Sequence, residues 1–169
     1  MSHATLERFY TAFQRLDGAA MQACYAPDAR FDDPAFSLRG AEQVGAMWRM
    51  LCAAAQAQGG EAWRLSFQVG TDGRSARWEA WYRFSATGRA VHNRIEARFS
   101  FDEQGRILTH QDQFDFWRWS RQALGLPGWL MGWSDWLRQK VRSQAAKNLG
   151  STPMGESDAL TALIGGTPA

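Results

Sequence analysis

The sequence predicts an α+β protein in which helices cover one face of an antiparallel sheet. Three helical segments come first, because apolar residues recur at helical spacing over 3–16, 18–25 and 41–57. Alternating apolar and polar residues then follow over 62–69, 75–86, 89–101 and from Gly105 onward, with turn sequences between them. Helices followed by hairpin-connected strands are typical of this class.

The chain of 169 residues fits one domain with a substantial core. We expect this domain to span 1–149, with its core over 4–120. Pro127 and Gly128 precede a tryptophan-rich segment that predicts a last helix over about 128–148. Gly, Ser, Thr and Pro dominate from Gly150, which predicts a flexible tail over 150–169.

Charge and composition narrow the classes of partner. The formal net charge is only +2, from 19 basic and 17 acidic residues, which is not the footprint of a nucleic-acid-binding protein. The first ten residues contain no long apolar run, and 122–134 is too short and too interrupted to cross a bilayer. We therefore expect a cytoplasmic protein with no membrane span.

The cysteines and histidines do not form a metal or redox motif. Two cysteines lie far apart in the sequence, and the three histidines are scattered: Cys24, Cys52, His3, His92 and His110. We expect two free thiols, no metal site and no cofactor.

The segment after Gly105 carries the strongest candidate site. With a period of two, one face of this strand holds Leu108, His110, Asp112, Phe114 and Phe116. Burying a carboxylate among apolar side chains is costly unless it is paired or hydrated in a pocket. Asp112 with His110 is either a general acid/base pair in such a pocket or a structural polar pair.

Asp33 and Tyr10 are further candidates for catalysis. Asp33 precedes Pro34, where it serves either as a base that removes a proton next to a carbonyl or as a turn or helix-capping residue. Tyr10 lies on the apolar face of the first helix, where it is either an oxyanion donor or a core residue with a satisfied hydroxyl.

The inward faces of the strands predict an apolar pocket. Asn93 is the one polar residue on the inner face of its strand, where it would contact a ligand carbonyl or satisfy Asp112. Aromatic side chains from the third helix and the strands would line the pocket or fill it as a packed core: Trp48, Trp63, Trp78, Tyr82 and Phe114.

Two sets of motifs resemble a known superfamily. The segment from Ala29 to Pro34 resembles one in the ketosteroid isomerases, and Thr87-Gly88-Arg89, Gly105-Arg106-Ile107 and His110-x-Asp112-x-x-Asp115 resemble SnoaL-like polyketide cyclases. Both groups belong to the nuclear transport factor 2-like superfamily, which the chain resembles over about 4–120. The resemblance implies a cone-shaped fold, in which a curved sheet of about four to six strands wraps around three helices and an apolar cavity.

The resemblance also implies chemistry. Asp33 corresponds to the general base of the isomerases, and Asp112 to the acid/base residue of the SnoaL type. The isomerases' oxyanion acid corresponds to Ala97, and the Asp-Arg-Asp set of limonene-epoxide-hydrolase relatives is replaced by Asn93, Ile95 and Ala97. The expected function is a cofactor-independent isomerase or cyclase acting on a hydrophobic carbonyl compound. The alternative is a non-catalytic homodimeric module that binds an apolar ligand and pairs through the outer sheet face.

Overall fold

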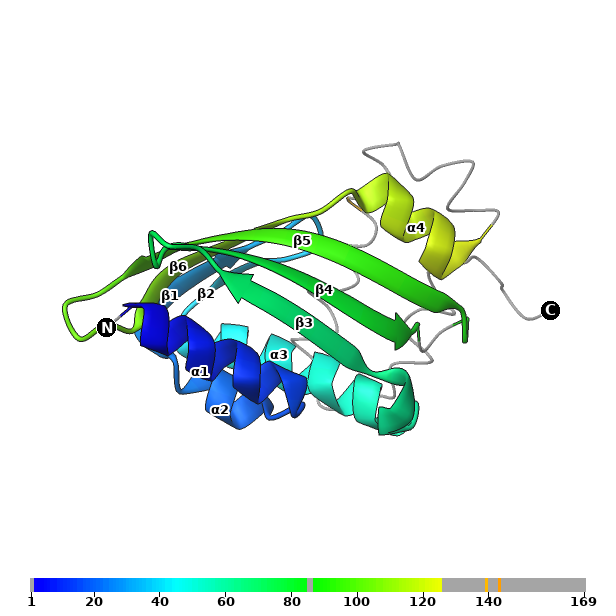
Figure 1. Ribbon diagram of the computed structural model, residues 1–169, viewed down its shortest axis with the longest axis horizontal. Helices are drawn as coiled ribbons and strands as arrows, with labels where there is room; N and C mark the ends of the chain where they lie inside the picture. Colours follow the sequence, from blue (N-terminus) through cyan, green and yellow to red (C-terminus); the bar gives the residue numbers. More distant parts are fainter. Residues whose placement is uncertain (1, 85–86, 126–138, 140–142, 144–169) are drawn as a thin grey trace.

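A curved six-stranded sheet covers three helices in the computed structural model of the chain (Figure 1). The structure describes residues 2–84, 87–125, 139 and 143. Helices α1 (Ser2–Gln14), α2 (Gly18–Gln22) and α3 (Ala41–Ala57) lie together on one side of the sheet. Helix α4 (Phe116–Leu124) lies at the far end of the molecule from the N-terminus. The expected α+β class is therefore confirmed.

The sheet consists of β1 (Tyr25–Asp32), β2 (Ser37–Arg39), β3 (Arg64–Val69), β4 (Ser75–Arg83), β5 (Ala90–Phe101) and β6 (Ile107–Gln113). Its strand order is β2-β1-β6-β5-β4-β3. A short 3₁₀ helix, Gly60–Ala62, leads from α3 into β3. All neighbouring strands pair antiparallel except β1 and β6, which run parallel. The parallel pair departs from a purely antiparallel sheet, and it joins segments that no hairpin connects.

The three helices occupy the predicted segments, but α2 is shorter than expected. Asp17 caps α2, since its Oδ1 accepts a hydrogen bond from the Ala20 amide at 2.9 Å. The helix ends at Gln22, so Tyr25 begins β1 instead of closing a helix over 18–25. Tyr25 pairs with Ile107 of β6, and this pairing overrides the helical spacing of the preceding apolar residues.

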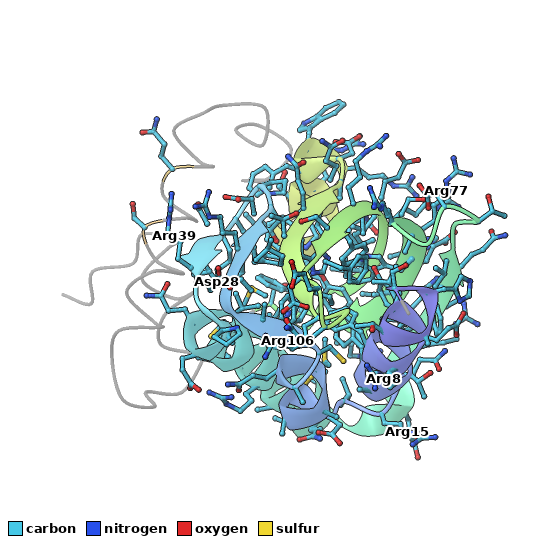
Figure 2. The ribbon with its side chains drawn as sticks, turned by 90° about the vertical axis from the view of Figure 1, so that its left-hand side faces the viewer. Arg8, Arg15, Asp28, Arg39, Arg77 and Arg106 are labelled. Atoms are coloured by element: carbon cyan, nitrogen blue, oxygen red, sulfur yellow. The ribbon has the colours of Figure 1, made fainter. Side chains whose placement is uncertain are left out.

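Alternation along the strands divides the two sheet faces as predicted, except at the start of β6, where a register shift beside Phe101 leaves Ile107 buried and Leu108 only half-buried. On β5 the inward side chains are buried at Val91, Ile95, Ala97 and Phe99, and the last three belong to the core cluster that also contains residues of the helices. The outer face pairs charges across strands, including Arg77 with Glu96 at 3.5 Å. Figure 2 shows charged side chains such as Arg77, Arg39 and Arg8 around the outside of the molecule.

The tryptophan-rich helix expected over about 128–148 and the tail expected over 150–169 lie outside the described residues. Before them, α4 carries Trp117 and Trp119 on the helix that follows β6. Asp115 caps α4, because its Oδ1 accepts a hydrogen bond from the Arg118 amide at 2.9 Å. The strand that carries the candidate site is thus bounded by a defined helix.

Candidate active site

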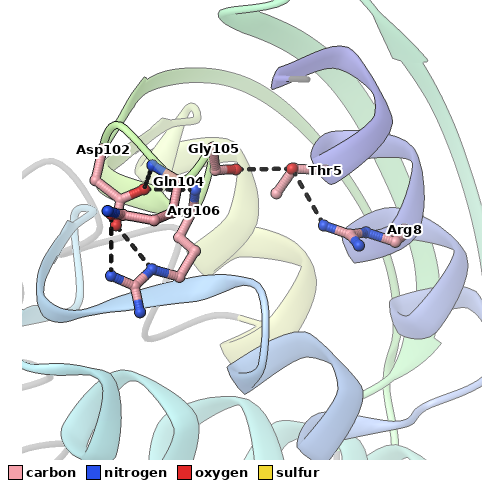
Figure 3. A network of polar contacts seen from close by, with 6 residues as sticks. All are labelled: Thr5, Arg8, Asp102, Gln104, Gly105 and Arg106. Carbon is pink, nitrogen blue, oxygen red and sulfur yellow. Dashed lines mark hydrogen bonds and ion pairs between the residues drawn. The ribbon is translucent and has the colours of Figure 1, made fainter.

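A hydrogen-bonded hairpin holds the start of β6 in place (Figure 3). Asp102 accepts hydrogen bonds from the amides of Gln104 and Arg106, and its Oδ2 lies 2.7 Å from Nε of Arg106. The Thr5 hydroxyl donates to the carbonyl oxygen of Gly105 at 2.8 Å, which ties the hairpin to α1 (Figure 3). These contacts set where β6 begins and therefore which of its residues face inward.

His110 and Asp112 lie on the inward face of β6, as the period of two predicts. Their side chains are 1% and 4% exposed, and Nε2 of His110 lies 3.0 Å from Oδ1 of Asp112. The Trp78 indole N–H donates to the same oxygen over a long 3.4 Å. Both hydrogen bonds from described residues reach Oδ1, so Oδ2 is the oxygen that remains for another partner.

The other imidazole nitrogen contacts a residue that the sequence did not indicate. Nδ1 of His110 lies 2.6 Å from the Tyr25 hydroxyl, and that hydroxyl accepts a hydrogen bond from the Trp48 indole N–H at 3.0 Å. Four buried side chains therefore form one chain from α3 through β1 to β6. Aromatic rings enclose the imidazole, including Phe99 with a centroid distance of 4.3 Å.

One arrangement of protons satisfies every donor in this chain. The Trp48 N–H only donates, so Tyr25 accepts there, and Nδ1 of His110 is the described acceptor within reach of the Tyr25 proton. In a neutral imidazole that accepts at Nδ1, the ring proton is on Nε2, where it is donated to Asp112. Burial raises the pKa of Tyr25 well above its ordinary value, so the phenol keeps the proton that it donates.

An apolar cavity of about 180 Å³ lies between the sheet and α3. Its wall includes eight of the ten residues that the sequence singled out: Trp48, Trp63, Trp78, Tyr82, Asn93, Phe114, Asp33 and Asp112. Cavities with aromatic walls and a few polar groups are typical of small-molecule sites. The volume falls below the roughly 300 Å³ of an ordinary ligand pocket.

Asp33 lines the same cavity and also holds a turn. Its Oδ1 accepts hydrogen bonds from the amides of Ala35 and Phe36 at 2.6 and 2.5 Å, an arrangement typical of the residue that opens an Asx turn. It does not cap the third helix, since α3 begins after Gly40 without a side-chain cap. The turn places Asp33 directly after β1 at the wall of the cavity.

Tyr10 and His110 do not line the cavity. Tyr10 is fully buried in the core, where its ring stacks on Phe67 with a centroid distance of 5.1 Å. Among the described residues no group hydrogen-bonds to its hydroxyl. Burial and the nearby Asp112 charge raise the pKa of Tyr10 well above its ordinary value, so the hydroxyl stays protonated. His110 lies behind the cavity wall, where it hydrogen-bonds to Asp112 and packs against the rings of Phe31 and Trp48.

Asn93 faces the cavity without satisfying Asp112. It pairs with Ala80 on β4, whereas Asp112 pairs with Ala97 on β5. Asn93 and Ala97 are four positions apart, which corresponds to about 13 Å along a strand. No described group hydrogen-bonds to the side-chain amide of Asn93. Asn93 and Asp112 are therefore polar groups at separate places in one apolar wall.

The sequence matches a known protein family. A family model described as the SnoaL-like domain matches residues 6–110. The chain therefore belongs to the SnoaL-like family, within the nuclear transport factor 2-like superfamily. No curated protein matches the sequence.

Solved structures share the fold at low sequence identity. A proposed polyketide cyclase from Pseudomonas putida KT2440 is 16% identical with a TM-score of 0.56, over 73% of this chain and 98% of that one. An LEH-like epoxide hydrolase from M. tuberculosis is 22% identical with a TM-score of 0.50, over 76% and 94%. SalBIII, an epoxide hydrolase/cyclase-like enzyme of pyran ring formation in salinomycin, is 13% identical with a TM-score of 0.53, over 67% and 89%.

The described part of the chain contains no helix that is long and apolar enough to cross a membrane. It also contains no group of three or more His, Cys, Asp or Glu side chains placed to hold a metal ion. Cys24 and Cys52 are both free and buried, as the sequence predicted.

Proposed function

We propose that this protein binds a hydrophobic carbonyl compound in its cavity and that Asp112 moves a proton to and from a carbon next to the carbonyl. The observation that carries this proposal is the state of Asp112. The carboxylate lies in an apolar wall with Oδ1 held by His110 and Trp78 and Oδ2 without a partner among the described residues. A base so held is oriented through one oxygen, and the other oxygen faces the substrate.

The chemistry needs only this chain's residues. Oδ2 of Asp112 would take the proton from the carbon, leaving the electron pair of the C–H bond as an enolate, and would return the proton to the same or another carbon. The Trp78 N–H, which makes only the long 3.4 Å contact with Oδ1, is the donor available for the developing enolate oxygen. His110 would act as a positioning residue, because it touches Asp112 and does not line the cavity.

The relatives by structure share the fold. A proposed polyketide cyclase and an LEH-like epoxide hydrolase are 16% and 22% identical to this chain, and such identities establish the shared fold alone. The second candidate is a homodimeric module that binds an apolar ligand without reaction, and the aromatic wall of the cavity favours it equally.

Exchange of α-protons separates the two candidates. The probe is 4-methoxyacetophenone in D₂O, with loss of its methyl ketone signal followed by proton NMR. We expect the wild-type protein to accelerate exchange and Asp112→Asn to lower the rate by roughly a hundredfold or more. Asp32→Asn is the matched control, because Asp32 is exposed and its contact with the Ser37 hydroxyl can be kept by an amide oxygen.

Two results would decide against catalysis at Asp112. Equal exchange by the wild type and Asp112→Asn would remove this carboxylate from the reaction. A probe that binds the wild-type protein without faster exchange would leave the binding module as the function of the cavity.

A further inference from the structure

A group of hydrogen-bond donors lies in the cavity wall away from Asp112. Trp63, Tyr82 and Asn93 all line the cavity, and the rings of Trp63 and Tyr82 have a centroid distance of 6.3 Å. Tyr82 pairs with Val91 on β5, so Asn93 is its diagonal neighbour on the same face. Diagonal neighbours in a sheet lie about 7–8 Å apart, within reach of one small ligand group.

Each of these side chains offers a hydrogen that the described protein does not use. The Trp63 indole nitrogen is buried and has no hydrogen-bond partner among the described residues. Tyr82 accepts a hydrogen bond from the Trp119 indole at 2.9 Å, so its own proton remains to be donated. Burial raises the pKa of Tyr82 to about 12, and the phenol therefore keeps that proton at neutral pH.

The space beside these donors is open to a ligand because the residue opposite Asn93 is small. Ala80 pairs with Asn93 and also lines the cavity. The side-chain amide of Asn93 has no hydrogen-bond partner among the described residues, and an unpaired amide in an apolar wall is costly unless something else satisfies it. The Trp63 indole can only donate, and Tyr82 already accepts from Trp119 and still has its own proton to donate, so the missing partner is an acceptor.

The volume of the cavity limits the rest of the ligand. A protein cavity of about 150 Å³ holds benzene. At about 180 Å³, this cavity has room for one six-membered ring with short substituents.

We infer that the ligand is a one-ring or similarly compact carbonyl compound that carries a hydrogen-bond acceptor, such as an ether or carbonyl oxygen, at the end remote from Asp112. The donors Trp63, Tyr82 and Asn93 bind that acceptor. This inference rests on the proposed function for the identity of the reacting end and names the substrate class of the same site. The donor group thereby orients the molecule with its reacting carbon at Asp112.

A matched pair of ketones tests the inference by binding alone. The ligands 4-methoxyacetophenone and 4-ethylacetophenone have nearly the same shape, but only the first has an acceptor oxygen on the ring. Dissociation constants come from tryptophan fluorescence, since Trp48, Trp63 and Trp78 line the cavity. We expect the methoxy ketone to bind about five- to tenfold more tightly to the wild-type protein.

Variants then show which side chains cause the preference for the methoxy ketone. Asn93→Leu keeps the size of the side chain and removes its donors, and it is expected to reduce the methoxy preference to less than twofold while the ethyl ketone still binds. Tyr82→Phe is expected to reduce the preference in part. Gln68→Leu, on an exposed position of β3, is the control that should leave it unchanged.

The outcomes separate this inference from the proposed function. Equal binding of the two ketones to the wild-type protein, or no binding of either one, overturns the inference. A preference that survives in Asn93→Leu also overturns it. Proton exchange lost in Asp112→Asn without any methoxy preference would leave the proposed function standing alone. A preference without proton exchange would support the donor group and contradict catalysis.

Discussion

Nε2 of His110 lies 3.0 Å from Oδ1 of Asp112, and both side chains are buried on the same face of β6. Behind this contact, Tyr25 holds the second imidazole nitrogen at 2.6 Å. The pair is therefore one end of a longer buried chain and not an isolated ion pair. This arrangement makes the protein's stability and its proposed chemistry depend on the same hydrogen bonds.

Two buried tyrosines provide a matched test of this chain. Tyr25→Phe removes the hydroxyl that satisfies His110 and Trp48, and leaving buried polar groups without a partner costs about 1–3 kcal/mol. We expect the free energy of unfolding to fall by about that amount in urea denaturation. Tyr10→Phe removes a buried hydroxyl that has no partner among the described residues, so we expect little loss or a small gain. Equal losses in the two variants would contradict the hydrogen-bond chain.

His110 is expected to affect the rate of proton exchange more than ligand binding. It donates to Asp112 but does not line the cavity, so His110→Phe should lower exchange by roughly tenfold or more while the dissociation constant of 4-methoxyacetophenone stays within about twofold. His110→Gln keeps an N–H donor and should recover part of the rate. Weaker binding with an unchanged rate would show that His110 contacts the ligand.

Asp33 has a role in the turn that can be separated from its charge. Asn can accept the same hydrogen bonds from the amides of Ala35 and Phe36, whereas Ala cannot. If Asp33 serves as a turn residue only, Asp33→Asn should keep both the thermal midpoint and the exchange rate, and Asp33→Ala should lower the midpoint. Loss of exchange in a normally folded Asp33→Asn variant would instead make Asp33 the base.

Alkaline pH should unfold the protein before its tyrosines ionise. The chain has three tyrosines, and burial raises the pKa of all three: Tyr10, Tyr25 and Tyr82. In the unfolded chain these groups ionise near pH 10, whereas Tyr82 in the folded state ionises at about 12. The unfolded state therefore binds fewer protons above pH 10, and stability falls as the pH rises from there toward 12.

The measurement is phenolate absorbance near 295 nm, followed together with circular dichroism. The two signals should change in the same pH range, because ionisation waits for unfolding. A phenolate signal that appears near pH 10 while the dichroism remains native would show that at least one of these hydroxyls is accessible in the folded protein.

Local sequence patterns predicted the parts of the site that lie on one strand. The period of two along β6 placed His110 and Asp112 on a common inward face, and the same period on β5 placed Asn93 inward. A strand's side chains alternate whatever its neighbours are, so these predictions needed no tertiary information. The aromatic wall was predicted for the same reason, since Trp78 and Tyr82 are four positions apart on β4 and therefore lie on the same face.

The partner of His110 could not be found in this way. Tyr25 and His110 are 85 positions apart, and their contact depends on the parallel pairing of β1 with β6. Local spacing placed Tyr25 in a helix with Met21 and Cys24, but helix α2 ends at Gln22. The one available signal was an aromatic hydroxyl at the start of β1, which is too common to single out a residue.

The sequence by itself determined the class of fold, which residues share a face of each strand, and most of the residues that line the cavity. These follow from the periods of helices and strands and from turn residues. The tertiary structure decided which of these residues meet. It joined Trp48, Tyr25, His110 and Asp112 into one hydrogen-bonded chain, and it placed Tyr10 in the core and Asn93 apart from Asp112. Such contacts join distant segments of the chain, and their geometry is set by strand order and packing rather than by any local pattern.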